Sequence, residues 1–156
     1  MSTPLTSVTT RLFEAPDLRA LYAIEEACFE PSVRFSRSLM RMLSHDPESR
    51  TWLGIVENVR AGFAIVGLKG DDDRSAAYIW TIEVLPVFRR RGVARALLAR
   101  MEESAREAGC TAIELHVAAD NSEALALYEG FGFARSGVDR EFYGRGSDAF
   151  RYRKLL

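Results

Sequence analysis

Lysine, cysteine and long apolar runs are scarce in this sequence, and each shortage excludes a class of protein. Only Lys69 and Lys154 are lysines among 21 basic residues, and the 22 acidic residues bring the net charge to −1. A general nucleic-acid binder or a binder of anionic membranes carries a strong positive excess, so we expect neither partner. Cys28 and Cys110 are too few and too far apart for a disulfide framework or a metal cluster. We expect free, buried thiols and no metal.

No stretch approaches the roughly 20 apolar residues that cross a membrane. The first ten residues lack the basic and apolar regions of a signal peptide, so we expect a cytoplasmic protein. With 156 residues, 47% of them hydrophobic and 28% charged, the chain has the composition of one globular domain. We expect a flexible tail at residues 1–6 and a single domain at residues 7–156.

The hydrophobic periodicity predicts alternating blocks of strand and helix. Strands are expected over residues 7–13, 51–57, 61–68, 76–84, 111–118 and 148–155, with a further one after residue 133. Helices are expected from 16 to about 28, from Ser36 to before Pro47, from Gly92 to Gly109, and from 120 to Glu129. Asp120 and Glu123 are spaced as in a capping box. This order predicts an α/β domain whose mixed, mostly antiparallel sheet of about seven strands is flanked by about four helices.

The most informative stretch joins a predicted strand to a predicted helix. Val84 ends the strand, three arginines follow at 89–91, and the helix begins at Gly92. A helix N-terminus has unpaired N–H groups and the positive end of the helix dipole, which together bind phosphate. Gly92 and the small Ala94 allow a pyrophosphate to approach the backbone. No P-loop or dinucleotide-binding motif is present, so the pattern predicts a different kind of anion site.

Two segments resemble one known family. The segment Arg89 to Ala94 matches the R/Q-x-x-G-x-G/A acyl-CoA signature of the GCN5-related N-acetyltransferases, with alanine where glycine is common. The segment from Asn121 to Phe133 is similar to the N-x-x-A-x-x-L-Y-x-x-x-G-F segment of that family. The order of predicted elements fits over residues 7–156. The late residues 140–144 and 148–150 look like the ending of the ribosomal-protein-alanine N-acetyltransferase branch.

The resemblance implies a fold, a co-substrate and a set of site residues. It implies a GNAT-like fold, acetyl-CoA as co-substrate, and direct attack of a primary amine on the thioester. The backbone of Ile82, Glu83 and Val84 would bind the pantetheine arm, and Asn121 would contact the cofactor. The residues expected to cradle the pyrophosphate are Arg89, Arg90, Arg91, Gly92, Val93 and Ala94.

Tyr128 is the expected general acid. Expulsion of a thiolate with a pKa of about 8.5 suits a tyrosine donor with a pKa of about 10. The base is open between two residues. The branch commonly has a glutamate where His116 stands, twelve residues before the tyrosine. An ordinary histidine is largely neutral at pH 7 and could accept a proton directly or through water, and Glu83 is its rival near the end of its strand.

The sequence says less about the residues that bind the acceptor amine than about any other part of the site. Acceptor contacts in this fold usually come from the first two helices and the last hairpin, so Phe29, Glu30, Phe35 and Tyr143 are the candidates. A protein α-amine, with a pKa of about 7.8, costs about 1 kcal/mol to deprotonate at pH 7, whereas a lysine costs about 4.6 kcal/mol. We expect a protein N-terminus as acceptor, and a monomer or homodimer. The alternatives are a small amine, such as an amino acid, polyamine or antibiotic, and a non-catalytic acyl-CoA-binding module.

Overall fold

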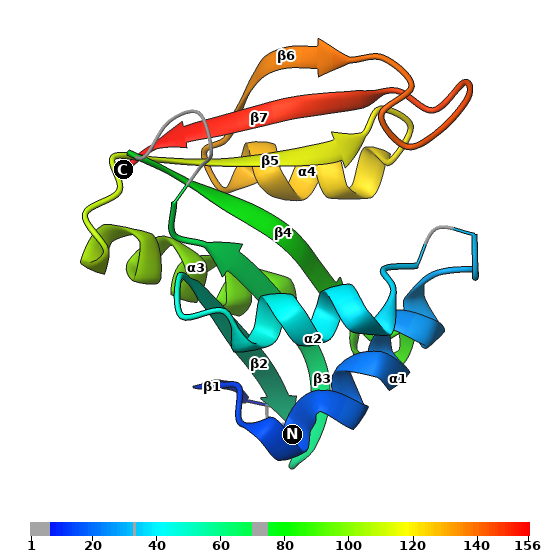
Figure 1. The fold of residues 1–156 in the computed structure, drawn as a ribbon, viewed down its shortest axis with the longest axis vertical. Coiled ribbons are helices and arrows are strands. Elements are labelled where there is room, and N and C mark those ends of the chain that lie inside the picture. Colours follow the sequence, from blue (N-terminus) through cyan, green and yellow to red (C-terminus); the bar gives the residue numbers. More distant parts are fainter. Residues whose placement is uncertain (1–6, 33, 70–74) are drawn as a thin grey trace, which may run out of the picture.

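One seven-stranded sheet organises the chain (Figure 1). The structure is a computed structural model that describes residues 7–32, 34–69 and 75–156. Its strands lie in the order β1-β2-β3-β4-β5-β7-β6, and every neighbouring pair is antiparallel except β4 and β5. The strands are β1 (Val8–Leu12), β2 (Ser49–Val56), β3 (Val59–Gly67), β4 (Ala76–Val84), β5 (Ala112–Ala118), β6 (Ala134–Asp139) and β7 (Ala149–Leu155). The predicted tail at residues 1–6 lies outside the described residues.

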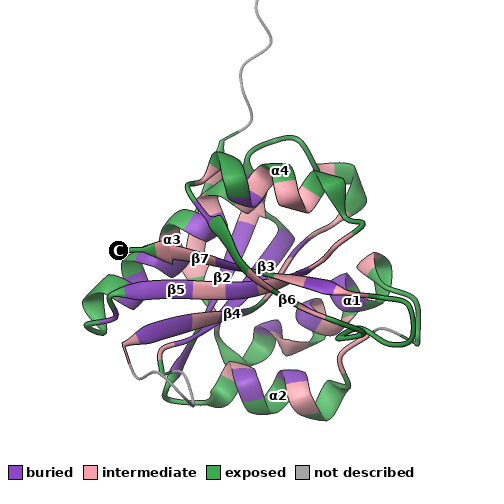
Figure 2. Cartoon of the chain, turned by 90° about the horizontal axis from the view of Figure 1, so that it is seen from above, coloured by how far each residue is buried: buried purple, intermediate pink, exposed green. Residues whose placement is uncertain are grey.

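Helices cover both faces of the sheet (Figure 2). They are α1 (Leu18–Cys28), α2 (Arg37–His45), α3 (Val93–Glu107) and α4 (Ser122–Gly130), and short 3-10 turns precede α1 and α3. Figure 2 shows α1 and α2 on one face and α3 and α4 on the other. The predicted mixed sheet with four helices is confirmed, including the element order. None of the helices in the described residues is long and apolar enough to cross a membrane.

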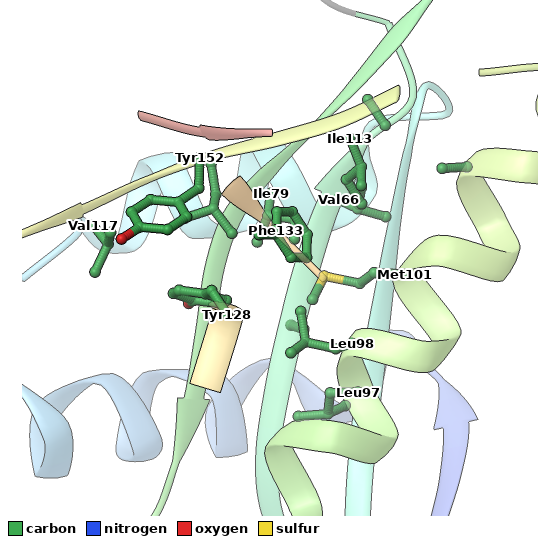
Figure 3. Close-up of a cluster of buried hydrophobic side chains, with 14 of the residues drawn as sticks. Val66, Ile79, Leu97, Leu98, Met101, Ile113, Val117, Tyr128, Phe133 and Tyr152 are labelled. Atoms are coloured by element: carbon green, nitrogen blue, oxygen red, sulfur yellow. The ribbon is translucent and has the colours of Figure 1, made fainter. Parts of the chain in front are cut away.

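Each face of the sheet has its own apolar core. Under α3 and α4, the sheet packs against Leu98, Met101, Phe133 and Tyr128, among other residues (Figure 3). Under α1 and α2, a smaller cluster includes Leu21 and the buried residues that follow: Ile24, Met40, Leu43, Leu53, Phe63 and Ile65. The sheet is therefore held by side chains from both of its faces, and a functional group on β4 can point toward either helical layer.

The parallel pair β4 and β5 separates after three residues. Ala76, Ala77 and Tyr78 pair with residues 112–114, and no further pairs follow. The register of β4 against β3 shifts at this point, because Ile65 pairs with Thr81 and Val66 with Ile79, which leaves Trp80 as an extra residue in β4. A bulge of this kind bends a strand. The bend coincides with the point where β4 leaves β5, and Figure 1 shows the two strands spreading apart.

Two local expectations from the sequence are corrected. The N-cap of α4 is Asn121, whose Oδ1 accepts a hydrogen bond from the backbone N–H of Ala124 at 3.2 Å, so Asp120 is not the capping residue. Cys110 is buried as expected, but Cys28 is only half-buried. It lies at the end of α1, where its thiol donates to the carbonyl oxygen of Val84 at 3.4 Å.

Candidate active site

The end of β4 that no longer pairs with β5 lines a cleft of about 600 Å³. Its walls come from the end of β4, the start of α3, one face of α4 and the end of α1. The residues that line it are Cys28, Phe29, Ile82, Glu83, Val84, Phe88, Arg89, Arg90, Gly92, Val93, Ala94, Arg95, Asn121, Glu123, Ala124, Leu127 and Tyr128. The two sequence motifs, Arg89 to Ala94 and Asn121 to Phe133, therefore both contribute residues to one cavity.

At one end of the cleft lies the N-terminus of α3. Gly92 is its N-cap and has a left-handed backbone with φ of 86°, and Arg90 also has a positive φ of 64°. A left-handed residue before a helix turns the chain so that the first N–H groups of the helix remain unpaired. Those N–H groups and the helix dipole favour an anion at this end, which fits the diphosphate of an acyl-CoA.

The three consecutive arginines separate in space. Arg89 and Arg90 line the cleft and Arg91 does not. The Arg91 guanidinium instead lies over the ring of Phe88, 5.6 Å from its centroid. Arg95, which the sequence analysis did not select, lines the cleft. It follows Gly92 by three residues, so helical spacing is the signal that would have found it.

One face of α4 forms the wall opposite β4. Glu123, Ala124, Leu127 and Tyr128 line the cleft, at the spacing of a single helix face. Tyr128 is 7% exposed and its ring packs edge-on against Phe133. Burial raises the pKa of Tyr128, and the nearby phenol of Tyr143 raises it further. Tyr128 is therefore fully protonated at neutral pH.

Glu83 is the buried acid of the cleft. Its side chain is 3% exposed, and one oxygen, Oε2, accepts a hydrogen bond from the Thr81 hydroxyl at 2.7 Å. Burial and the neighbouring carboxyl of Glu25 raise the pKa of Glu83 to about 9. A carboxyl group with this pKa can exchange a proton with an amine near neutral pH.

His116 lies outside the cleft lining. Its Nε2 is 2.7 Å from Asp139 Oδ2, and its Nδ1 is 2.7 Å from the Tyr78 hydroxyl. A carboxylate can only accept, so Nε2 carries the N–H of this contact, and Nδ1 faces the Tyr78 hydroxyl. Phe142 stacks on the ring with centroids 4.1 Å apart. Both ring nitrogens are thus engaged in a network that joins β4, β5 and β6.

The residues proposed for the acceptor side are spread around the cleft. Phe29 lines the cleft, whereas Phe35 lines a second pocket, of about 200 Å³, beside α1 and α2. Tyr143 lies in the loop between β6 and β7, close enough to Tyr128 to raise its pKa. Glu30 is exposed and lines neither of these pockets.

All residues that line the cleft lie within a stretch of the sequence that matches a known enzyme family. The model of the acetyltransferase (GNAT) family matches residues 18–133. The chain belongs to this family. Its members use acetyl-CoA, and the chain is an N-acetyltransferase.

Individual relatives cover most of the chain. The chain is 31% identical over 136 residues to the ribosomal protein bS18-alanine N-acetyltransferase of Escherichia coli, with 86% of each chain covered. It is also 31% identical over 121 residues to an acetyltransferase of Pectobacterium atrosepticum, which covers 76% of this chain and 82% of that protein. The crystal structure of the ribosomal-protein-S18-alanine N-acetyltransferase from Escherichia coli superposes with a TM-score of 0.84 at 25% identity, covering 96% of this chain and 94% of the other.

The raised pKa of Glu83 predicts how stability depends on pH. The folded state holds a proton up to about pH 9, whereas an unfolded glutamate releases it near pH 4.3. The stabilising contribution of the protonated form is therefore complete below about pH 4 and is lost as the pH rises through 9. We expect the melting temperature of the wild type to fall more steeply between pH 5 and 9 than that of Glu83→Gln, measured by calorimetry. Parallel curves for the two proteins would contradict the shifted pKa.

Proposed function

We propose that this GNAT enzyme transfers the acetyl group of acetyl-CoA to the α-amine of a protein N-terminus. The observation that carries the proposal is the single cleft that joins the N-terminus of α3 to Tyr128 and Glu83. An anion site at one end and proton-exchanging groups at the other suit a long phosphorylated thioester that must be cleaved beside an amine. The 31% identity to an alanine N-acetyltransferase supports an N-terminal acceptor.

In this proposal the donor lies along the edge of β4. Beyond Tyr78, the edge of β4 that faces β5 has no strand partner in the described residues. The backbone of Ile82, Glu83 and Val84 can therefore bind the amides of the pantetheine arm, while the first N–H groups of α3 and the arginines at 89, 90 and 95 hold the diphosphate. The Oδ1 atom of Asn121 accepts the hydrogen bond that caps α4. Its Nδ2 group is therefore the one that can donate a hydrogen bond to the cofactor.

Tyr128 is the proposed general acid. Its raised pKa keeps the proton in place until the thiolate leaves, and the closed surroundings exclude water as a competing donor. The acceptor must also lose a proton before it attacks. An α-ammonium with a pKa of about 7.8 is much easier to deprotonate than a lysine, so an N-terminus demands less of a base in the cleft.

Acetylation of a peptide panel tests the proposed acceptor. The enzyme is incubated with acetyl-CoA and peptides that differ in their first residue, and thiol release is followed together with the mass of the product. We expect acetylation at the N-terminal amine and none at an internal lysine of the same peptide. Turnover of a polyamine, an amino acid or an antibiotic in place of every peptide would transfer the assignment to a small amine.

The Tyr128→Phe variant separates catalysis from binding. The phenyl ring keeps the packing against Phe133 and loses only the proton donor. We expect kcat to fall by about 10- to 100-fold or more, the range of general acid catalysis, with the Kd of acetyl-CoA nearly unchanged by calorimetry. An unchanged kcat would remove Tyr128 from the mechanism, and a protein that binds acetyl-CoA without turning over any amine would be a binding module.

Charge reversal at two neighbouring arginines tests the diphosphate site. Arg90 lines the cleft and Arg91 lies over Phe88, so the two variants Arg90→Glu and Arg91→Glu have the same net charge and differ in placement. We expect Arg90→Glu to weaken CoA binding by roughly tenfold, since a charge at an exposed site is worth about 1 kcal/mol, and Arg91→Glu to weaken it less. Equal losses of CoA affinity in the two variants would mean that the arginines act only through their net positive charge and not through their positions.

A further inference from the structure

Four carboxylic side chains in the described residues are buried, and they fall into two groups. Asp17 forms ion pairs with Arg11 and Arg60, each at 2.7 Å. Glu102 forms ion pairs with Arg106 at 3.7 Å and Lys154 at 2.5 Å. Cations of this kind are what a buried carboxylate ordinarily needs. The other two, Glu25 and Glu83, make no ion pair with any cation in the described part of the chain.

Glu25 and Glu83 face each other instead. Glu25 comes from α1 and Glu83 from β4, each is 3% exposed, and the carboxyl group of each lies close enough to shift the pKa of the other. The Oε1 atom of each is buried and has no hydrogen-bond partner among the described residues. A buried acceptor without a donor is destabilising, and Oε1 of Glu83 belongs to a residue that lines the cleft. We therefore expect these two Oε1 atoms to accept hydrogen bonds from a bound ligand.

The pair also separates two cavities. Glu83 lines the cleft, whereas Glu25 lines the second pocket together with Tyr22, Glu26, Arg34, Phe35, Arg37 and Met40. Arg37 and Glu26 at the rim of this second pocket are exposed and form an ion pair at 2.7 Å. The two carboxyl groups thus stand between the reacting end of the cleft and a pocket whose rim meets solvent.

We infer that Glu83 binds the ammonium group of the acceptor and takes its proton, and that Glu25 is a positioning residue that passes this proton to solvent through the second pocket. This inference rests on the proposed transfer to an amine. It adds a residue from α1 and a proton path to the site, and it names a cationic amine as the ligand of the two unpaired oxygens.

The protons balance over one cycle. The free pair holds one shared proton, which leaves to solvent when the cationic ammonium binds beside it. Before the nitrogen attacks the thioester carbonyl, the pair takes one proton from it and returns to its starting state. A second proton of the nitrogen replaces the one that Tyr128 gives to the departing thiolate. Each transfer therefore converts one ammonium and one thioester into an amide and a thiol and releases one proton.

The carboxyl pair and the acceptor amine have similar affinities for a proton. The pair holds a proton up to about pH 9, since burial and the facing carboxyl raise the pKa of Glu83. An α-ammonium has a pKa of about 7.8, so transfer to the pair is favoured by about tenfold. The other titratable or charged groups beside the pair are Cys28 of α1 and Arg34 before α2, and Arg89 before α3 acts on Cys28. The positive charge of Arg34 favours the ionised form of Glu25, which helps the pair to lose its proton when the ammonium binds.

Proton release on acceptor binding tests this inference directly. A peptide with a free N-terminal alanine is titrated into the CoA complex of the enzyme at pH 6.5, in buffers with different ionisation enthalpies. We expect release of close to one proton with the wild type. The N-acetylated form of the same peptide, which has no ammonium, should release none. Equal proton release with both peptides would overturn the inference without any variant.

Three variants test whether the released proton comes from the Glu25–Glu83 pair. Glu83→Gln and Glu25→Gln should abolish the proton release and lower kcat/KM by about 10- to 100-fold, the range of general base catalysis, while the Kd of acetyl-CoA changes by less than about twofold. Their melting temperatures should be equal to or above that of the wild type, because each amide supplies a donor to the remaining carboxyl. Glu102→Gln, a buried carboxyl paired with cations, should keep both the proton release and kcat/KM.

The outcomes distinguish this inference from the proposed function. If the peptide is acetylated but proton release persists in both variants of the pair, the pair has no such role and the proposed function stands. If only small amines are acetylated, the proposed function fails. The active amine and its acetylated product then replace the two peptides in the same titration, and the same results decide the role of the pair.

Discussion

The separation of β4 from β5 is the constraint on which the site depends. Parallel strands in a sheet normally continue side by side, but here the pairing stops at Tyr78 and the extra residue Trp80 bends β4 away. The elements that form the site are arranged around the edge of β4 that this separation leaves unpaired. The unpaired edge of β4 forms one wall of the cleft, the start of α3 closes one end, and α4, on the same face of the sheet as α3, contributes Tyr128. A continuous β4–β5 ladder would fill the space in which the thioester and the amine must meet.

The two ends of the cleft have opposite electrostatic character. The start of α3 offers unpaired N–H groups, the positive end of a dipole and the side chains of Arg89, Arg90 and Arg95. The other end holds Glu83 with Glu25 behind it, buried and without ion pairs in the described residues. A donor with an anionic diphosphate and an acceptor with a cationic amine would therefore be drawn to different ends. Such sorting positions two substrates without a large binding surface for either.

Local patterns predicted the elements well because each depends on neighbouring residues. The start of a helix at Gly92 and the short helix that carries Tyr128 depend on patterns within a few residues, and both were predicted. The pairing of Glu25 with Glu83 was not, since it joins residues far apart in the sequence through the packing of α1 against β4. The bulge at Trp80 also has no local signature here, because a bulge depends on the register of β3 against β4 rather than on one strand alone.

A crystal structure of the protein with CoA tests the central claim most directly. We expect the diphosphate against the N–H groups at the start of α3, the pantetheine arm along Ile82 to Val84, and the sulfur atom within hydrogen-bond reach of the Tyr128 hydroxyl, with Glu83 on the acceptor side. A CoA molecule bound away from α3, or one whose sulfur lies remote from Tyr128, would contradict the account.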